Sequence, residues 1–305
     1  MLIVFGSINL DISVRVPHLP KAGETVLGGD VLMSAGGKGA NQAHAAALYG
    51  VPTAMFGAIG HDAFAEPAIT PLRSANVDIR GVSVCASDPT GIAMIDVTHA
   101  GENVIVVAPG ANLSARGDAV SDATLRESRA LLLQLEVDPE ESLRLARRAK
   151  QHGCLVILNA SPQSAGFQIT TESLDIVIVN KGELADLCAR HEVFGIDPVD
   201  QARVLAHALQ VDVLVTLGEE GSFLMQSDGH CMACPAMPVS PVDTTGAGDT
   251  FAGVFAAAIA AGEPVKHAMQ AASVAAGIAC TRPGAQIAQP RRAEIDAALA
   301  GLGPR

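Results

Sequence analysis

Aromatic side chains are scarce in this sequence. Its 305 residues include no Trp, one Tyr and eight Phe. A core built with so few rings has to be filled by Ala, Val, Leu and Ile, and small residues allow helices to pack close to a sheet. Because 49% of the residues are hydrophobic, the chain can bury one large α/β core, with or without a small appendage.

Positive charge is also in short supply. Lys and Arg number 20 against 32 Asp and Glu, which gives a formal net charge of −12. Proteins that bind nucleic acid or an anionic membrane need a basic face, so we expect neither partner. A bound phosphate would have to rely on backbone dipoles, one or two cations and a metal ion.

Long apolar runs and clustered cysteines are missing as well. The runs near 251–261 and 268–280 are too short or too interrupted to span a membrane. The first residues lack a basic region and are typical of a strand, not of a signal peptide. Of six cysteines only Cys231 and Cys234 lie close in sequence, and we favour a packing role for them over a zinc or redox site. A reduced, cytoplasmic protein is therefore expected.

What the sequence does contain is a regular alternation of apolar runs and helical segments. Strands are predicted at 2–6, 53–59, 130–135, 155–158, 176–179 and 213–216. Helices are predicted at 40–48, 117–128, 139–150, 183–189, 198–209, 249–261, 265–280 and 291–300. This order predicts an α/β fold of three layers, α/β/α, with a doubly wound, mostly parallel sheet. Segment 62–75 is expected to be a short or broken helix because it contains Pro67 and Pro71.

Two segments depart from this alternation, at about 12–35 and 82–108. Both show the period-two pattern of half-buried strands, separated by turn residues. We interpret them as a small β-sheet that is inserted, as a lid, into a single domain spanning 1–305. One apolar face of such a sheet would be exposed, so we expect it to pair with a second copy and form a homodimer.

Several polar residues directly follow predicted strands. They are Asn9, Asp11, Glu136, Asn180 and Thr216. In doubly wound sheets the ligand lies at the carboxyl ends of the strands, so these residues are expected to meet there. Taken singly, each is equally typical of a residue that caps a turn or a helix.

Glycine-rich turns precede two predicted helices. In the first, Gly36 to Ala43, three glycines surround Lys38, and Asn41 follows in the helix. Because Gly39 follows the lysine, the stretch is not a P-loop. It can offer N–H groups, an ammonium and an amide to a polyhydroxylated ligand, although a plain helix start remains an alternative.

The second glycine turn runs from Val242 to Phe251. Gly246 and Gly248 allow a ligand to approach the backbone, and the helix start provides free N–H groups for an anion. Asp249 adds a carboxylate that can act as a base or, in the simpler interpretation, as a helix cap. Two further turns, 180–183 and 216–221, can bind a nucleotide and its Mg²⁺, or serve only as a capped helix and a hairpin.

Together and in this order, the motifs resemble those of the PfkB carbohydrate kinases, and most closely the branch of that family that acts on ribose. The resemblance rests on the stretches 6–11, 36–43, 134–136, 180–183 and 243–251, and covers essentially the full chain. It implies ATP-dependent phosphorylation of the primary 5-hydroxyl of D-ribose to ribose 5-phosphate. Asp249 is then expected to be the general base, and the N–H groups of Gly246, Ala247, Gly248 and Asp249 the anion hole.

The resemblance also implies the remaining roles in the site. Sugar hydroxyls are expected at Asn9, Asp11, Gly37, Lys38, Asn41, Glu136 and Asp249. ATP is expected along Asn180, Thr216, Gly218, Gly221 and Gly248, with Mg²⁺ held through water near Glu183. A potassium ion or another monovalent cation is expected at Asp243, Thr245, Ala279, Arg282 and Gly284.

Departures from the family pattern leave alternatives open. Ala288 stands where a serine hydroxyl often meets the cation, and Val179 where a proline usually precedes Asn180. The acceptor could instead be deoxyribose, a ketose or a nucleoside. A sugar- or nucleotide-binding sensor without activity is a third possibility, but a sensor has no need of Asp249.

Overall fold

The computed structural model describes residues 1–98, 100–162 and 173–302. Within these residues, nine strands form a central sheet in the order β13-β12-β11-β10-β9-β8-β1-β4-β5. Their bounds are β1 Leu2–Phe5, β4 Thr53–Gly60, β5 Asp78–Cys85, β8 Ala130–Leu133, β9 Leu155–Asn159, β10 Ile176–Asn180, β11 Asp212–Thr216, β12 Ser222–Met225 and β13 Cys231–Cys234. The strands from β5 to β11 are parallel, and β12 and β13 continue the sheet as an antiparallel hairpin.

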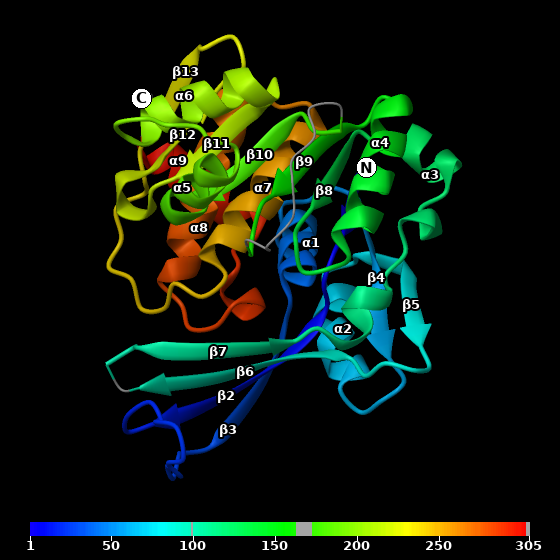
Figure 1. Ribbon diagram of the computed structural model, residues 1–305, viewed down its shortest axis with the longest axis vertical. Coiled ribbons are helices and arrows are strands. Elements are labelled where there is room, and N and C mark those ends of the chain that lie inside the picture. The colour runs from blue at the N-terminus through cyan, green and yellow to red at the C-terminus, as the bar shows by residue number, and fades with distance from the viewer. Residues whose placement is uncertain (99, 163–172, 303–305) are drawn as a thin grey trace.

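Helices cover both faces of this sheet, and each face has its own hydrophobic cluster. One face carries α1 Lys38–Leu48, α2 Ala65–Ser74, α7 Ala247–Ala261, α8 Val265–Cys280 and α9 Arg292–Leu302. The other carries α3 Asp122–Glu127, α4 Pro139–Gln151, α5 Lys181–Arg190 and α6 Pro198–Leu209. The predicted three-layer architecture is therefore confirmed (Figure 1).

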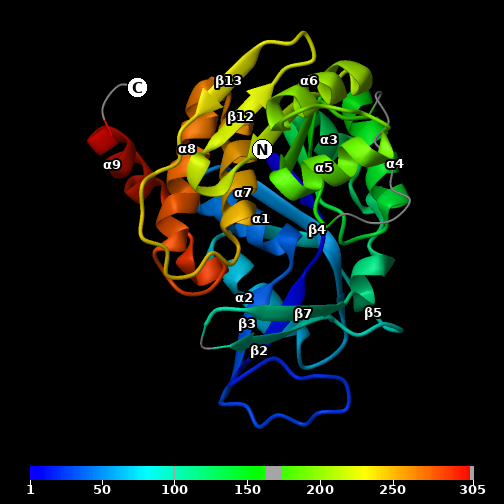
Figure 2. The same ribbon diagram turned by 60° about the vertical axis from the view of Figure 1, so that its left-hand side comes forward.

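A separate four-stranded sheet has the order β3-β2-β6-β7. It consists of β2 Asn9–Val16, β3 Val31–Gly36, β6 Gly91–Thr98 and β7 Asn103–Ala108, and we call it the lid sheet. Figures 1 and 2 show that it projects from the main body. The chain passes between the two from β1 to β2, from β3 to α1, from β5 to β6 and after β7, and β3 contacts α2. Residue 99, inside the second predicted lid segment, lies outside the described residues.

Three details of the predicted elements were wrong. Residues 82–85 belong to β5, which pairs with β4 at the edge of the central sheet and not with the lid sheet. The segment 62–75 holds a continuous ten-residue helix. Pro67 lies in its first turn, where N–H groups have no partner within the helix, and the helix also continues through Pro71 in its interior. The predicted helix 117–128 is a 3₁₀ turn, Gly117–Ala119, followed by the short helix α3.

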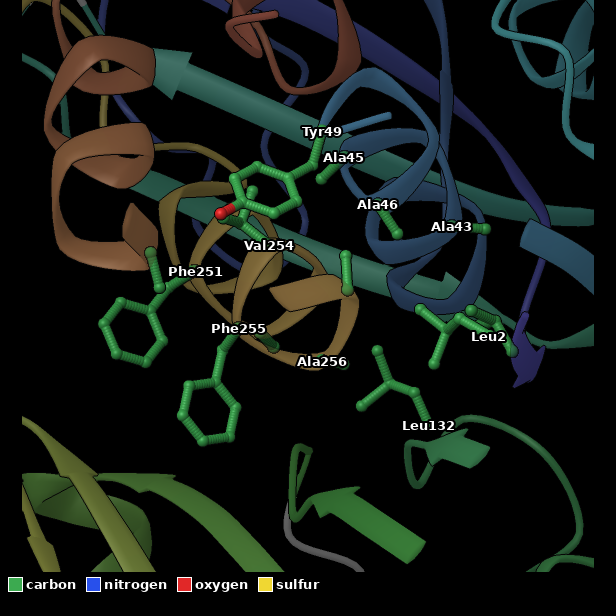
Figure 3. Packing of buried hydrophobic residues seen from close by; sticks show 14 of the residues in the cluster. Leu2, Ala43, Ala45, Ala46, Tyr49, Leu132, Phe251, Val254, Phe255 and Ala256 are labelled. Atoms are coloured by element: carbon green, nitrogen blue, oxygen red, sulfur yellow. The ribbon is translucent and has the colours of Figure 1, made fainter. Parts of the chain in front are cut away.

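The helices α1 and α7, which carry the two glycine turns, pack directly against each other. Gly253 makes this possible, because a Cβ atom there would lie 2.4 Å from the carbonyl oxygen of Gln42. Figure 3 shows Ala45 and Ala46 of α1 on the side of Val254 and Ala256 of α7, and the rings of Phe251 and Phe255 are stacked with centroids 6.4 Å apart. Small residues thus bring the two helices that carry both glycine turns into direct contact.

Of the two neighbouring cysteines, Cys234 packs in the core, while Cys231 does not have the packing role that was expected of the pair. They lie three residues apart on β13, where Cys231 is exposed and Cys234 is buried, so they point to opposite faces of the strand. Among the described residues, no helix is long and apolar enough to cross a membrane.

Candidate active site

Polar side chains gather at the carboxyl edge of the central sheet, where the strand order reverses between β1 and β8. Such a reversal leaves a crevice in which doubly wound sheets bind ligands. Ser7, just after β1, donates from Oγ to Oε2 of Glu136, which follows β8, at 2.5 Å. The same Glu136 oxygen accepts the backbone N–H of Lys38 at 3.1 Å. Glu136 therefore ties the first glycine turn to both strands that border the crevice.

Asp249 lies in the first turn of α7 and is only 8% exposed. The residue that precedes the helix, Gly246, has a φ of 71°, a conformation that glycine adopts without strain. Oδ2 of Asp249 accepts from Nδ2 of Asn41 at 2.9 Å, and Oδ1 accepts from Nε2 of Gln42 at 3.0 Å. Two successive residues of α1 thus hold the two oxygens of the predicted base.

The first glycine turn needs glycine because it lies very close to the backbone that follows β1. Gly37 has a φ of 86°, and a Cβ atom there would lie 2.8 Å from the backbone nitrogen of Asn9. A Cβ atom on Gly39 would lie 2.7 Å from the backbone of Gly6 and Ser7. Larger residues would push the start of α1, and with it Lys38 and Asn41, away from the crevice.

Charges of both signs meet in the crevice. Burial, together with the charges of Glu136 and Asp249, raises the pKa of Asp11 from 3.8 to about 7. Burial alone would lower the pKa of Lys38, but the carboxylates of Asp249, Glu136 and Glu183 outweigh it and raise that pKa. Lys38 is therefore a charged cation, and the three carboxylates that act on it come from three different parts of the chain.

Asn9 has a partner that the sequence did not indicate. Its Oδ1 accepts from Nδ2 of Asn112 at 2.7 Å, while Oδ1 of Asn112 accepts the N–H of Ile8 at 2.8 Å. Both asparagine side chains are buried. Asn112 thereby fixes the residues that connect the central sheet to the lid sheet.

A cavity of about 720 Å³ lies beside the start of α7. It is lined by Thr216, Gly218, Gly221 and Gly248, four of the five residues predicted to lie along ATP, and by apolar groups such as Met237 and Phe251. A Cβ atom on Gly248 would meet nothing within 4 Å, so this glycine faces open space. The cavity reaches the helix start at which an anion is expected.

Asn180, the fifth of these residues, does not line the cavity. It caps α5, since its Oδ1 accepts the N–H of Glu183 at 2.9 Å and its own N–H donates to Oε2 of Glu183 at 2.8 Å. Asn180 is nevertheless paired with Thr216 across β10 and β11, so it lies next to the cavity wall. The carboxylate of Glu183 is close enough to the crevice to raise the pKa of Lys38.

The residues predicted to hold a monovalent cation lie on two loops that Asp243 connects. Its Oδ1 accepts the N–H of Thr245 at 2.9 Å, and its Oδ2 accepts the N–H of Gly284 at 2.8 Å. Burial acts to raise the pKa of Asp243, but these N–H groups outweigh it and lower that pKa, so the carboxylate is ionised. Ala279 and Arg282 are linked by a backbone hydrogen bond at the end of α8.

A second cavity, of about 870 Å³, lies between α2, the lid strand β3 and the residues 282–294. Of the predicted site residues, it borders only Arg282 and Gly284. It contains neither Asp249 nor the glycine turn of α1, and we assign it no part in the site.

Comparison with known proteins agrees with this arrangement. The family model described as "pfkB family carbohydrate kinase" matches residues 1–292. The chain belongs to the PfkB carbohydrate kinase family. As a member it is a phosphotransferase whose acceptor is an alcohol group.

Individual relatives of this PfkB chain are called ribokinases. The ribokinase of Haemophilus influenzae is 35% identical over 297 residues, which is 96% of each chain. That of Schizosaccharomyces pombe is 33% identical over 307 residues, covering 97% of this chain and 96% of the relative. A solved structure of Arabidopsis thaliana ribokinase in complex with ribose and ATP is similar, with a TM-score of 0.87, 32% identity and 98% of both chains covered. The ribokinase structure from Thermotoga maritima has a TM-score of 0.87, 33% identity, and 98% and 99% coverage.

Sequence reasoning missed five polar residues that support the site. They are Ser7, Gln42, Asn112, Gln134 and Asn159. Two of them carried a usable signal, since Gln42 directly follows Asn41 and Gln134 stands two residues before Glu136. The roles of Ser7, Asn112 and Asn159 depend on contacts between residues far apart in the chain, so they can be found only in the folded structure.

Proposed function

We propose that this chain transfers the γ-phosphoryl group of ATP to the primary 5-hydroxyl of D-ribose and so makes ribose 5-phosphate. The observation that carries the proposal is the position of Asp249. It is a buried carboxylate at a helix start, between a cavity of nucleotide size and the polar crevice at the sheet edge. The names of the relatives and the ribose and ATP bound in the Arabidopsis structure support this choice of substrates.

In the proposed reaction, Asp249 removes the proton of the sugar hydroxyl as its oxygen attacks phosphorus. The N–H groups of Gly246 to Asp249 stabilise the charge on the transferring group, in line with the small covalent role that proteins have in phosphoryl transfer. The start of α7 has no side-chain cap, which leaves it available to an anion. The N–H of Ala247 donates to the carbonyl of Thr244 at 3.2 Å and has to give up this bond in order to contribute.

The crevice is proposed to hold the sugar. Asp11 and Glu136 accept hydrogen bonds from hydroxyl groups, Lys38 donates, and the peptide of Gly37 allows close approach. Asn9 and Asn41 are buried and already bonded to Asn112 and Asp249. In the proposed complex, Asn9 and Asn41 therefore contact the sugar with donors and acceptors that these two bonds do not use.

Two metal sites fit the residues that are present. Glu183 uses one oxygen as a helix cap, which suits a magnesium ion held through water and not directly. Asp243 and the carbonyl groups of Thr245, Ala279, Arg282 and Gly284 suit a monovalent cation, which would hold the two loops together and orient the anion hole. With Ala288 in place of serine, we expect potassium to stimulate this protein less than a relative that has the hydroxyl.

We further propose that the protein is a cytoplasmic homodimer. On one face of the lid sheet, Met33, Ile12, Met94 and Val106 form a row of directly paired residues. Asp11 lies on the opposite face, since it is one residue from Ile12 along β2. The exposed row with Met33, Met94 and Val106 thus lies on the face away from Asp11, where a second copy can cover it. Leu32, Ile105 and Val107 are exposed on the face of Asp11 itself.

A coupled assay of ADP release tests the function with ribose, deoxyribose, ketoses and nucleosides as acceptors. We expect the highest kcat/KM with ribose. A higher kcat/KM with another acceptor would mean that this acceptor, and not ribose, is the substrate. Saturable binding without turnover of any acceptor would instead indicate a sensor.

A further inference from the structure

Amide side chains from three other elements form a connected chain that ends on Asp249. Gln42 on α1 donates from Nε2 both to Oδ1 of Asp249 at 3.0 Å and to Oδ1 of Asn159 at 2.9 Å. Its own Oε1 accepts from Nε2 of Gln134 at 2.7 Å. All three amides are buried in the core below the crevice.

A backbone carbonyl group fixes which end of each side-chain amide donates and which accepts. Nδ2 of Asn159 donates to the carbonyl oxygen of Ile178 at 3.2 Å, and a carbonyl oxygen can only accept. Oδ1 of Asn159 must therefore face Gln42, which in turn has to present its NH₂ group. Both hydrogens of that group are then used, one by Asn159 and one by Asp249, so Gln42 cannot flip without losing several bonds at once.

We propose that Gln42 is a positioning residue that aims the carboxylate of Asp249 at the sugar hydroxyl. The inference rests on the proposed function of Asp249 as base. Gln42 is 0% exposed, so it cannot touch the substrate and acts only through the carboxylate. With Asn41 on Oδ2 and Gln42 on Oδ1, each oxygen is held by one donor and the carboxylate plane is fixed, while further lone pairs remain for the hydroxyl.

The variant Gln42→Met tests this role, because it keeps the length of the side chain and removes the donor. A carboxylate freed on one side spends less time in the reactive orientation, and misplacement by about 1 Å can cost about 100-fold in rate. We expect kcat to fall by roughly 10- to 100-fold. The KM values and the directly measured affinities for ribose and ATP should stay unchanged, which general damage to the fold would not produce.

A double-mutant cycle with Asp249→Asn separates positioning from structure. If Gln42 acts through the carboxylate, adding Gln42→Met to Asp249→Asn should cause no further loss of kcat. Equal losses in both backgrounds would overturn the inference. An active wild type whose Gln42→Met variant keeps its kcat would also overturn it, without affecting the proposed function.

Tyr49→Phe is the matched control. Tyr49 is the residue that ends α1, and its hydroxyl donates to Oε2 of Glu263, just beyond α7, at 2.7 Å. The variant thus removes a bond at the other end of the same helix pair, and kcat should not change. If Gln42→Met does not fold, Gln42→Glu keeps the shape and replaces the donor with an acceptor, and the same loss of kcat is expected. A wild type that phosphorylates no acceptor would overturn both the inference and the proposed function.

Discussion

Asp249 combines burial with two fixed hydrogen bonds, and both properties shape what its replacement should do. In Asp249→Asn the residue keeps its size but can no longer take a proton. We expect turnover to fall by about 10²- to 10⁴-fold, the usual contribution of a general base. Ribose binding should persist, because Asp11, Lys38 and Glu136 remain.

Calorimetric titration with ribose, beside the ADP-release assay, checks both parts of this expectation. Full activity in the variant would show that Asp249 is not the general base. Loss of binding together with turnover would mean that the variant has disturbed the crevice.

The raised pKa of Asp11 gives a second prediction at this scale. In the unfolded chain this carboxyl has a pKa near 3.8, and in the folded protein its pKa is about 7. Between these values the folded state binds more protons, so the stability that Asp11 contributes when protonated is lost as pH rises from about 4 to 7. Asp11→Asn, which never ionises, should therefore have a Tm that increasingly exceeds that of wild type over this range.

Thermal unfolding of ligand-free wild type and Asp11→Asn at several pH values measures this difference. A constant difference in Tm would show that Asp11 is not the group that titrates. In wild type, ribose affinity should rise as Asp11 ionises near pH 7, since only the carboxylate accepts two hydroxyl hydrogens.

Among the secondary-structure elements, the crossing of α1 and α7 matters most to the site. Asn41 and Gln42 come from α1, Asp249 comes from α7, and Gly253 lets the two helices approach. In Gly253→Ala the added methyl group meets the backbone of Gln42, which cannot move as a side chain would. Overpacking of this kind typically costs about 1–3 kcal/mol, and we expect kcat to fall as well, because the helices separate where they hold the base.

Gly248→Ala is the control for this prediction. Its methyl group would enter open space, so chemical denaturation should show little change in the free energy of unfolding. It would also project into the proposed ATP cavity, so the KM for ATP should rise. A stable Gly253→Ala variant would show that the two helices adjust more easily than their contact suggests.

The elements also show where the sequence was informative. Strands such as Leu2–Phe5 and Ile176–Asn180 and helices such as Pro139–Gln151 were predicted well, because apolar runs and proline or glycine boundaries mark them locally. β5 was assigned to the wrong sheet, since nothing local indicates which strand an edge strand will pair with. Asn112 and Asn159 were missed for the same reason, because their roles arise from contacts between residues far apart in the chain.

At the scale of the whole molecule, we expect a second copy to cover the lid sheet on the face that carries Met94. Met94 lies in the paired row on that face and is 55% exposed, while Ile105 is 54% exposed on the opposite face. Met94→Glu should convert the expected dimer into a monomer, because a buried, unpaired carboxylate is costly at an interface. Ile105→Glu should leave the dimer intact.

Sedimentation over a range of protein concentrations distinguishes these cases. A wild type that remains monomeric at every concentration would refute the dimer. If Met94→Glu and Ile105→Glu both dissociate the dimer, the interface does not lie on the Met94 face of the lid sheet alone.

The buried surroundings of α7 have a consequence for motion. Nearly all of this helix lies in the core, and only its first turn reaches the site. Amide hydrogens in such a helix exchange with solvent mainly when the whole domain opens, whereas those of an exposed, separate sheet exchange through local opening. Hydrogen exchange should therefore show α7 strongly protected already without ligand, with ribose and ATP adding only the protection that ligand binding gives to the whole domain. In β2, β3, β6 and β7, binding should convert fast local exchange into protection. The base would then stay still while the sheet opposite it moves.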